Sequence, residues 1–281
     1  MPHDHLHDHG EPDIAGMAEL VDLDAEVMQH YVSDVMAWVA TAMPHPQRVL
    51  DVGAGTGTGS VALAARFGSA DITAIDASDD MLQRARAKIA ERGLGDRVRT
   101  VVADLDAGWP HLPPADLIWA SLSLHHMADP QRVLADAHRA LRPGGVLAVL
   151  EMGRPPRFLP DDLGIGRPGL EERVHDAVAA THAESMPTMG TDWGPRLRTA
   201  GFTAVDTREF SLDLEPPLPP ATSRYAATYL SRVRPRLDGR LADDDLATLD
   251  TLLADRGPHS IVERGDLRVT GSRSGWLARK D

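Results

Sequence analysis

Residues 48–67 constrain the fold more than any other part of this sequence. Residues 49–52 are apolar and mostly β-branched apart from Asp51, so they predict a buried strand. Glycine then occupies every other position over residues 53–59, and residues 60–67 have the spacing of an amphipathic helix. A strand, a glycine-rich turn and a helix in this order predict the first crossover of an α/β sheet. Because glycine accepts positive φ and lets a ligand approach the main chain, this stretch predicts a small-molecule site.

Two classes of ligand use such a turn. A nicotinamide or flavin dinucleotide requires G-x-G-x-x-G directly after the strand; Gly53 and Gly55 fit, but Thr58 occupies the third position. A later register over residues 57–62 satisfies the pattern but lies beyond the turn. A carboxylate in an apolar strand is costly to bury unless a cationic or hydrogen-bonding group answers it. Asp51 would therefore repel a pyrophosphate and favour a ligand that carries an ammonium and a sulfonium group.

Residues 49–57 resemble the first motif of class I S-adenosylmethionine-dependent methyltransferases. The resemblance covers residues 48–150 with several ordered motifs and continues more loosely from residue 201 to the end. It implies an α/β, Rossmann-like, doubly wound seven-stranded sheet with an antiparallel last strand, N-terminal helices and an inserted helical cap. It also implies S-adenosylmethionine as cofactor and transfer of its methyl group to a small-molecule acceptor, with O-, N- and C-methylation all open.

Acidic residues end two further predicted strands, residues 71–76 and 98–105. Asp76 lies 19 residues after Gly57, close to the spacing expected for an acid that binds ribose hydroxyls. Asp104 resembles the family's acceptor for the adenine amino group. In an open parallel sheet, ligands bind beyond the carboxyl ends of the strands near the switch in strand order. The glycine turn and these carboxylates are therefore expected to converge on one edge of the sheet.

The resemblance implies a cofactor site built from the glycine turn, the strand ends and the residues that follow them. Ser78 is a plausible N-cap for the helix after the second strand, and Met81 either packs on adenine or belongs to the core. The predicted cofactor-binding residues are Asp51, Gly53, Ala54, Gly55, Gly57, Asp76, Ala77, Met81, Asp104, Leu105 and Ser121.

Two adjacent histidines follow the fourth predicted strand, residues 115–121. His125-His126 with the downstream Asp129-Pro130 resembles small-molecule methyltransferases. Since histidine titrates near neutrality, His125 or His126 could contact the cofactor or act as a base toward a hydroxyl or a carbon acid, and His126 is the one we name as the candidate catalytic base. The alternative is structural, with one histidine capping the loop and the other packed. The candidate substrate contacts are Tyr31, His125, Glu151, Arg154 and Arg157, where a salt bridge is the alternative role of Glu151.

The chain divides by pattern into a tail, a cap and a main domain. Residues 1–14 predict a disordered, histidine-rich tail, with metal binding by its alternating histidines as the alternative. Residues 15–46 predict an N-terminal helical cap that ends at a Pro-His-Pro sequence. Residues 47–281 predict the methyltransferase domain, with a lid loop at residues 152–192 and a helical insertion at residues 221–258. The insertion caps the substrate or forms a dimer contact, and no metal site is predicted.

Composition limits the compartment and the partners. The net charge of −13 and the lack of a Lys/Arg-rich run argue against a nucleic-acid partner. The absence of cysteine excludes disulfides and thiolate catalysis and is compatible with a cytoplasmic location. No apolar run approaches the roughly 20 residues that span a bilayer, and no signal-peptide core is present. We expect a monomer or homodimer with a small-molecule substrate; an NAD(P)-dependent oxidoreductase and a non-catalytic cofactor-binding relative are the alternatives.

Overall fold

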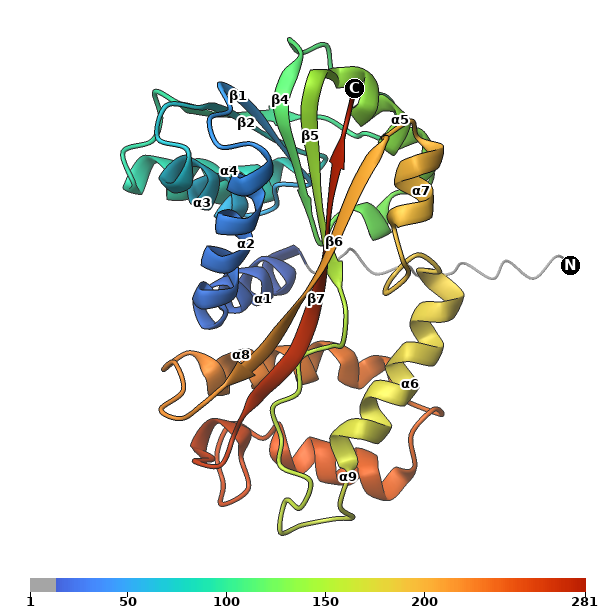
Figure 1. The fold of residues 1–281 in the computed structure, drawn as a ribbon. Coiled ribbons are helices and arrows are strands. Elements are labelled where there is room, and N and C mark those ends of the chain that lie inside the picture. The colour runs from blue at the N-terminus through green and yellow to red at the C-terminus, as the bar shows by residue number, and fades with distance from the viewer. Residues whose placement is uncertain (1–13) are drawn as a thin grey trace, which may run out of the picture.

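The computed structural model describes residues 14–281 and contains a seven-stranded sheet in the order β3-β2-β1-β4-β5-β7-β6 (Figure 1). Neighbouring strands from β3 to β5 are parallel, and β7 is antiparallel to both β5 and β6. This confirms the predicted fold class. The predicted histidine-rich tail lies outside the described residues except for Ile14, which begins the first helix. The strands are β1 (Arg48–Val52), β2 (Asp71–Asp76), β3 (Val98–Val102), β4 (Ala115–Ser121), β5 (Leu141–Met152), β6 (Ala204–Leu214) and β7 (Val269–Arg279).

Helices cover both faces of the sheet. Apolar residues of α2, α3 and α4 pack on one face, and those of α5 and α7 pack on the other (Figure 1). The helices are α1 (Ile14–Val27), α2 (Gln29–Ala42), α3 (Thr58–Arg66), α4 (Asp79–Glu91), α5 (Pro130–Ala140), α6 (Leu170–Ser185), α7 (Gly194–Thr199), α8 (Thr222–Val233) and α9 (Asp243–Leu252), with the 3-10 turns η1 (Leu124–His126), η2 (Arg234–Arg236) and η3 (Ile261–Glu263).

Burial on both faces explains why the central strands are nearly continuous apolar runs. In β1, Val49 packs with the α2–α4 side, and Leu50 packs with the α5–α7 side. By the same alternation Asp51 points toward α3, where Ser60 donates a hydrogen bond to it. Local capping fixes the helix starts: Ser78 accepts a hydrogen bond from the Met81 amide, which confirms the predicted N-cap.

A second apolar cluster forms what we call the helical lobe, made of α1, α6, α8, α9 and η3. Strands β6 and β7 extend beyond the ends of the other strands and reach into this lobe (Figure 1). The sequence left a strand pair or one broken strand open for the end of the chain; β7 is a single strand. It pairs with β6 over its full length, so the lobe is tied directly to the edge of the sheet.

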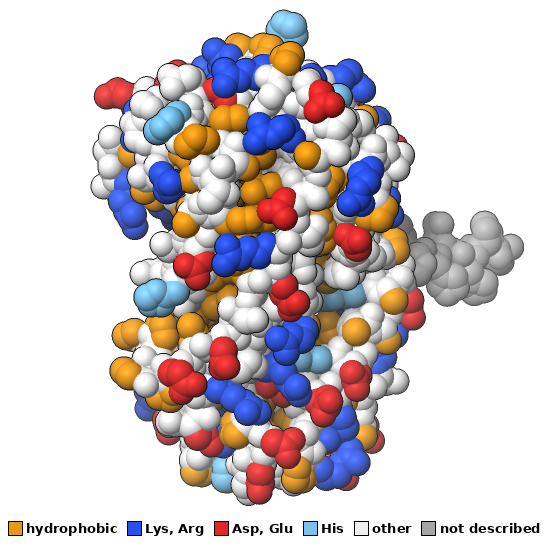
Figure 2. All heavy atoms as spheres, viewed as in Figure 1, with side chains coloured by type: hydrophobic (Ala, Val, Ile, Leu, Met, Phe, Trp, Pro, Cys, Tyr) orange, Lys and Arg blue, Asp and Glu red, His pale blue; other side chains and the backbone are white. Residues whose placement is uncertain are grey.

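Two surface features bear on the expected partners. No helix within residues 14–281 is both long and apolar enough to cross a membrane. On the face seen in Figure 2, Lys and Arg side chains alternate with Asp and Glu side chains over both parts of the molecule. A basic stripe of the kind that follows a nucleic-acid backbone is therefore not present on that face.

Candidate functional site

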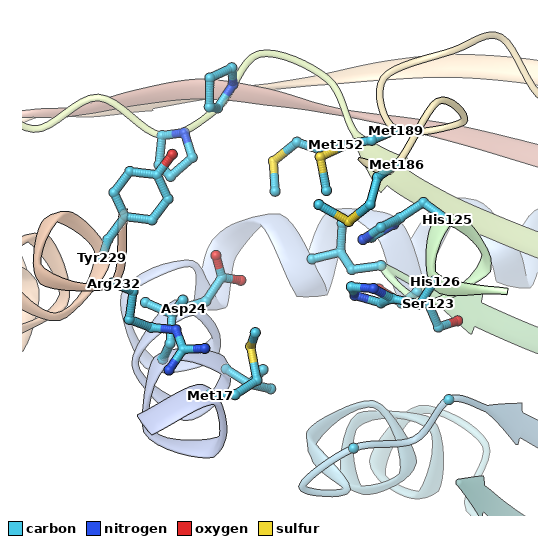
Figure 3. A pocket seen from close by; sticks show the side chains of 18 of the residues that line it. Met17, Asp24, Ser123, His125, His126, Met152, Met186, Met189, Tyr229 and Arg232 are labelled. Atoms are coloured by element: carbon cyan, nitrogen blue, oxygen red, sulfur yellow. The ribbon is translucent and has the colours of Figure 1, made fainter. Parts of the chain in front are cut away.

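A large pocket lies between the carboxyl ends of the parallel strands and the helical lobe. Its volume is about 2100 Å³. The sheet contributes the glycine turn and the residues that follow β2, β3, β4 and β5, while α1, α2, α6 and α8 form the remaining walls. In Figure 3, His125, His126 and Ser123 lie at one side of this pocket, and Tyr229 and Arg232 of α8 lie at the other.

The three glycines of the predicted motif serve different physical purposes. All have positive φ: +67° at Gly53, +52° at Gly55 and +79° at Gly57. A Cβ on Gly53 would lie 2.3 Å from the Ser123 Cβ, and one on Gly57 would lie 2.7 Å from the Ala85 Cβ. A Cβ on Gly55 would meet nothing within 4 Å and would project into open space. Gly53 and Gly57 therefore permit close packing, and Gly57 does not line the pocket, whereas Gly55 leaves the main chain bare beside it.

Asp76 orients this turn from the end of β2. One of its carboxylate oxygens accepts the Gly55 amide at 2.8 Å, and the other accepts the Ser78 amide at 2.9 Å. An ionised carboxylate offers about four acceptor positions, so roughly two remain for a ligand in the pocket. Asp104 is exposed at the next strand end, and its carboxylate accepts the Asp106 amide at 2.9 Å. Both acids line the pocket, as the sequence predicted.

Asp51 is a buried carboxyl at the floor of the same region. Its Oδ2 accepts the Ser60 hydroxyl at 2.6 Å. Burial raises the pKa of Asp51 to about 7; the Ser60 hydrogen bond opposes this rise, and the Asp76 charge adds to it. A Cβ on Gly59 would lie 3.1 Å from both Asp51 Oδ2 and the Trp119 Nε1. Gly59, which was not among the predicted site residues, therefore allows α3 to start against Asp51.

A pH-dependent stability follows from Asp51. Between its unfolded pKa near 4 and its folded pKa of about 7, the folded state binds the extra proton, so stability is lost as pH rises through this range. Asp51→Asn removes this loss, and we expect the variant to be more stable than the wild type at pH 8 by up to about 4 kcal/mol. At pH 4 the two proteins should differ little. Urea unfolding at both pH values measures the difference; an equal effect at both would contradict the shift.

The predicted contacts divide between the pocket and its surroundings. Tyr31, His125 and His126 line the pocket. Burial of the Tyr31 hydroxyl away from water raises its pKa. Arg154 and Arg157 do not line it, contrary to expectation. The reason is that the chain here pairs with β7: the Arg154 amide donates to Ser272 Oγ and the Arg157 main chain pairs with Thr270. The remaining predicted residues that line the pocket are Gly53, Ala54, Ala77, Met81, Leu105 and Ser121.

Helix α1 is anchored directly to the glycine turn. Asp22 accepts the Thr56 hydroxyl at 2.5 Å and the Lys88 ammonium at 2.6 Å. Lys88 also donates to the Thr58 hydroxyl at 2.8 Å. Residues on the next turns of α1 line the pocket. These anchors join α1, the turn and α4 across separate parts of the chain, and no local sequence pattern marked them.

Sequence reasoning also missed much of the wall that the helical lobe supplies. His175 and His182 are seven residues apart on α6 and both line the pocket. Burial lowers the pKa of His175 to about 4, with a smaller contribution from Arg157. Their spacing on one helical face was a usable signal. Within residues 14–281, no group of three or more His, Asp or Glu side chains is arranged to hold a metal ion.

Comparison with known proteins agrees with this geometry. A family model described as "Methyltransferase domain" matches residues 49–145. The chain is 33% identical to nocamycin O-methyltransferase of Saccharothrix syringae over 199 residues, which is 66% of this chain and 69% of that protein. The chain belongs to the class I S-adenosylmethionine-dependent methyltransferase family.

Other relatives agree over shorter stretches. Malonyl-[acyl-carrier protein] O-methyltransferase of Laribacter hongkongensis is 36% identical over 188 residues, 63% of this chain and 58% of that protein. The chain thus spans less than two thirds of that relative's length. The solved structure of Haemonchus contortus phosphoethanolamine N-methyltransferase 2 with phosphomonomethylethanolamine and S-adenosylhomocysteine has a TM-score of 0.51 at 16% identity, covering 88% of this chain and 52% of that one. At that identity the likeness concerns the fold.

The residues of this pocket fit the family's cofactor. The bare main chain at Gly55 leaves space that a side chain would fill, and the Asp76 carboxylate beside it has acceptor positions left over. Asp51 provides a buried carboxyl whose ionised form a cationic ligand would favour. A bare turn flanked by carboxylates suits an adenosyl group joined to a positively charged chain, and a pyrophosphate would meet repulsion there.

Proposed function

We propose that this protein binds S-adenosylmethionine at the carboxyl edge of its sheet and transfers the methyl group to a small-molecule acceptor. The observation that carries the proposal is the main chain at Gly55, which has positive φ and open space where a side chain would be. Its amide donates a hydrogen bond to Asp76, and both residues line the large pocket. Bound S-adenosylmethionine supplies an electrophilic methyl group on a sulfonium. The protein has to hold an acceptor in line with that group, which contributes several kcal/mol to the barrier reduction.

We assign the cofactor contacts by their place on this edge. Asp76 would accept the ribose hydroxyls, Asp104 and the Leu105 main chain would meet adenine, and Asp51 would face the cationic end. Ala54, Ala77, Met81 and Ser121 line the same part of the pocket and complete this set. Gly53, which also lines the pocket, and Gly57, which does not, let the turn pack on Ser123 and Ala85.

The size and lining of the pocket support a bulky, mostly apolar acceptor. Its volume of about 2100 Å³ is roughly twice the upper end of the 300–1,000 Å³ typical of a site for one ligand. The lining is rich in methionine, whose flexible side chain adapts to irregular apolar shapes. Besides Met81 and Met127, the lining methionines are Met17, Met152, Met186 and Met189 (Figure 3). The names of the relatives, which act on malonyl-[acyl-carrier protein] and nocamycin, fit an acceptor other than a nucleic acid.

We assign the three segments predicted as cap, lid and insertion to different walls of the pocket. Helices within residues 15–46 would cover the cofactor, and residues 152–192, which include α6, would act as the lid. The insertion at residues 221–258 contributes α8 to the acceptor side. A cytoplasmic location and a monomeric or dimeric state remain predictions. The absence of a nucleic-acid partner is also a prediction, supported by the net charge of −13.

Calorimetric titration tests the proposal directly. S-adenosylmethionine and S-adenosylhomocysteine should bind saturably at one site, while NADPH should give no heat under the same conditions. Incubation with S-adenosylmethionine labelled with tritium in its methyl group, together with a panel of hydroxylated apolar acceptors, should then yield labelled product. Binding of NADPH in place of S-adenosylmethionine would identify an oxidoreductase, and cofactor binding without any transfer would identify a non-catalytic relative.

Asp76→Ala should weaken S-adenosylhomocysteine binding by about 1–3 kcal/mol, because the ribose hydroxyls lose their acceptor and the Gly55 amide loses its own. Calorimetry of the purified variant measures the change in Kd. Asp79→Ala is the matched control: the same substitution three residues along, on an exposed side chain that pairs with Arg86 and does not line the pocket. Unchanged affinity in Asp76→Ala would mean that the ribose lies elsewhere.

A further inference from the structure

A buried carboxylate and an imidazole meet at the wall of the pocket. Glu151, at the end of β5, is fully buried, and its Oε2 lies 2.5 Å from His125 Nδ1. Its other oxygen accepts the Leu124 amide at 3.0 Å. Burying a carboxylate away from water costs free energy unless each oxygen has a hydrogen-bond partner. Here the Leu124 amide pairs with one oxygen and the His125 imidazole with the other. His125 is only 6% exposed, yet its ring lines the pocket.

The turn that places this pair has an unfavourable backbone conformation. Leu122 has φ +52°, and among residues 14–281 it is the one residue other than glycine with positive φ. The turn is held on both sides: the Leu122 amide donates to Leu150 O at 2.8 Å, and Ser123 Oγ donates to Val52 O at 2.9 Å. Left-handed backbone at a bulky residue costs about 1–2 kcal/mol and clusters at functional sites. The strained turn lies directly before the 3-10 turn that carries His125.

The hydrogen bond to Glu151 decides which ring nitrogen of His125 can act. An ionised carboxylate only accepts, so Nδ1 carries the proton of this bond. In the neutral ring, Nε2 then has a free lone pair. No hydrogen bond to His125 Nε2 is formed within residues 14–281, and the atom is not sealed away from the pocket. This arrangement matches a general base whose second nitrogen is oriented by a carboxylate.

The neighbouring titratable groups lie on η1 itself and on two other elements, α6 and α2. The ring of His126 on η1 lies 4.0 Å from that of His125, centroid to centroid. His182 of α6 interacts electrostatically with both histidines, and Tyr31 of α2 interacts with Glu151. His126 lines the pocket and is exposed there. Loss of bulk water, then repulsion by His125 and His182, lowers its pKa to about 4, so it is a weak base at neutral pH.

We propose that His125, oriented by Glu151, removes the proton from the acceptor group that receives the methyl, and that this group is an alcohol or phenol hydroxyl. The assignment rests on the proposed function and moves the base from His126 to its neighbour. The acceptor O–H bond breaks, its proton goes to His125 Nε2, and the electron pair left on oxygen forms the bond to the methyl carbon. The methyl–sulfur bond breaks and its electron pair stays on sulfur. The imidazolium, stabilised by Glu151, returns its proton to water after product leaves.

The pair distinguishes hydroxyl acceptors from other oxygen and nitrogen nucleophiles. An acceptor carboxylate is already ionised at neutral pH and gains nothing from a base. A neutral amine attacks with its own lone pair and loses its proton only after transfer. Of these three acceptors, the hydroxyl is the one that a positioned base helps most, typically by 10²–10⁴-fold.

The first test reads the imidazole without any acceptor. Nitrogen-15 NMR of the protein saturated with S-adenosylhomocysteine should show the neutral His125 ring protonated at Nδ1 and free at Nε2. In Glu151→Gln, the side-chain oxygen would still accept the Leu124 amide and the NH2 group would face Nδ1, so the proton should move to Nε2, and Glu151→Asp should keep it at Nδ1. A proton at Nε2 in the wild type, or a tautomer that Glu151→Gln leaves unchanged, would overturn the assignment.

The second test compares acceptors of one shape. Transfer of the tritiated methyl group to 2-naphthol, 2-naphthylamine and 2-naphthoate should favour 2-naphthol, and His125→Asn should reduce that rate by 10²-fold or more while binding S-adenosylhomocysteine normally. His138→Asn, the same change outside the pocket, is the control. Faster transfer to the amine or the carboxylate, transfer to none of the three, or a larger loss in His126→Asn would refute it. If the wild-type protein did not bind S-adenosylhomocysteine at all, the proposed function itself would be refuted.

Discussion

Replacing Gly55 with valine is expected to abolish binding of S-adenosylmethionine while leaving the fold in place. The new side chain would enter the open space that the bare turn leaves in the pocket, because no atom lies within 4 Å of a Cβ at this position. The cofactor would then have to give up its approach to the main chain. Calorimetry with S-adenosylhomocysteine should show no heat of binding, and circular dichroism should remain that of the wild type.

The matched control is Gly93→Val. Gly93 has φ +64°, close to the +52° of Gly55, and a Cβ there also meets nothing within 4 Å. It lies after α4 and does not line the pocket. Both variants should therefore lose similar stability, about 1–2 kcal/mol or somewhat more for a β-branched residue with positive φ. Only Gly55→Val should lose the ligand; equal binding by the two variants would mean that the cofactor does not contact this turn.

Removing Asp24 is expected to cause the largest loss of stability. Arg273 is 1% exposed and donates to Asp24 Oδ1 at 2.9 Å, across 249 residues of sequence. The Asp24 side chain is 22% exposed and also accepts the Tyr225 hydroxyl at 2.5 Å. Asp24→Leu leaves a guanidinium in the interior without a carboxylate, which costs about 3–5 kcal/mol. The midpoint of urea unfolding should fall accordingly.

A double-mutant cycle separates the charge from the packing. Arg273→Met should cost less than Asp24→Leu, because Asp24 keeps the Tyr225 hydroxyl and partial access to water. The double variant should recover part of the loss, since apolar side chains replace both charges. Strictly additive losses in the double variant, or a smaller loss in Asp24→Leu than in Arg273→Met, would show that the pair does not stabilise the protein.

Local patterns were enough to predict the sheet and to place the strand-end acids at one edge of it. Asp76 and Asp104 could be placed at one edge because parallel strands end together, and the structure has both beside the pocket. The motif glycines were harder to rank from sequence. Gly53, Gly55 and Gly57 look alike there, yet only the neighbours Ser123 and Ala85 reveal which of them are needed for packing.

The residues expected to contact the substrate were the poorly predicted part. Arg154 and Arg157 follow β5 in a loop rich in proline and glycine, which suggested contact with substrate. Their main chain is instead drawn into pairing with β7, a strand more than 110 residues later. Glu151 was expected to face the substrate or form a salt bridge, and its partner is His125 from the neighbouring strand end.

By itself the sequence determined the order of strands and helices, the bare turn and the row of strand-end acids. These depend on residues near one another in the chain, where periodicity and glycine content act directly. Only the tertiary structure decided that Glu151 orients His125 and that Arg273 meets Asp24. Those pairs depend on which strands become neighbours in the sheet and on how α1 packs against β7. Such long-range packing is set by burial over the whole chain, which a local pattern does not record.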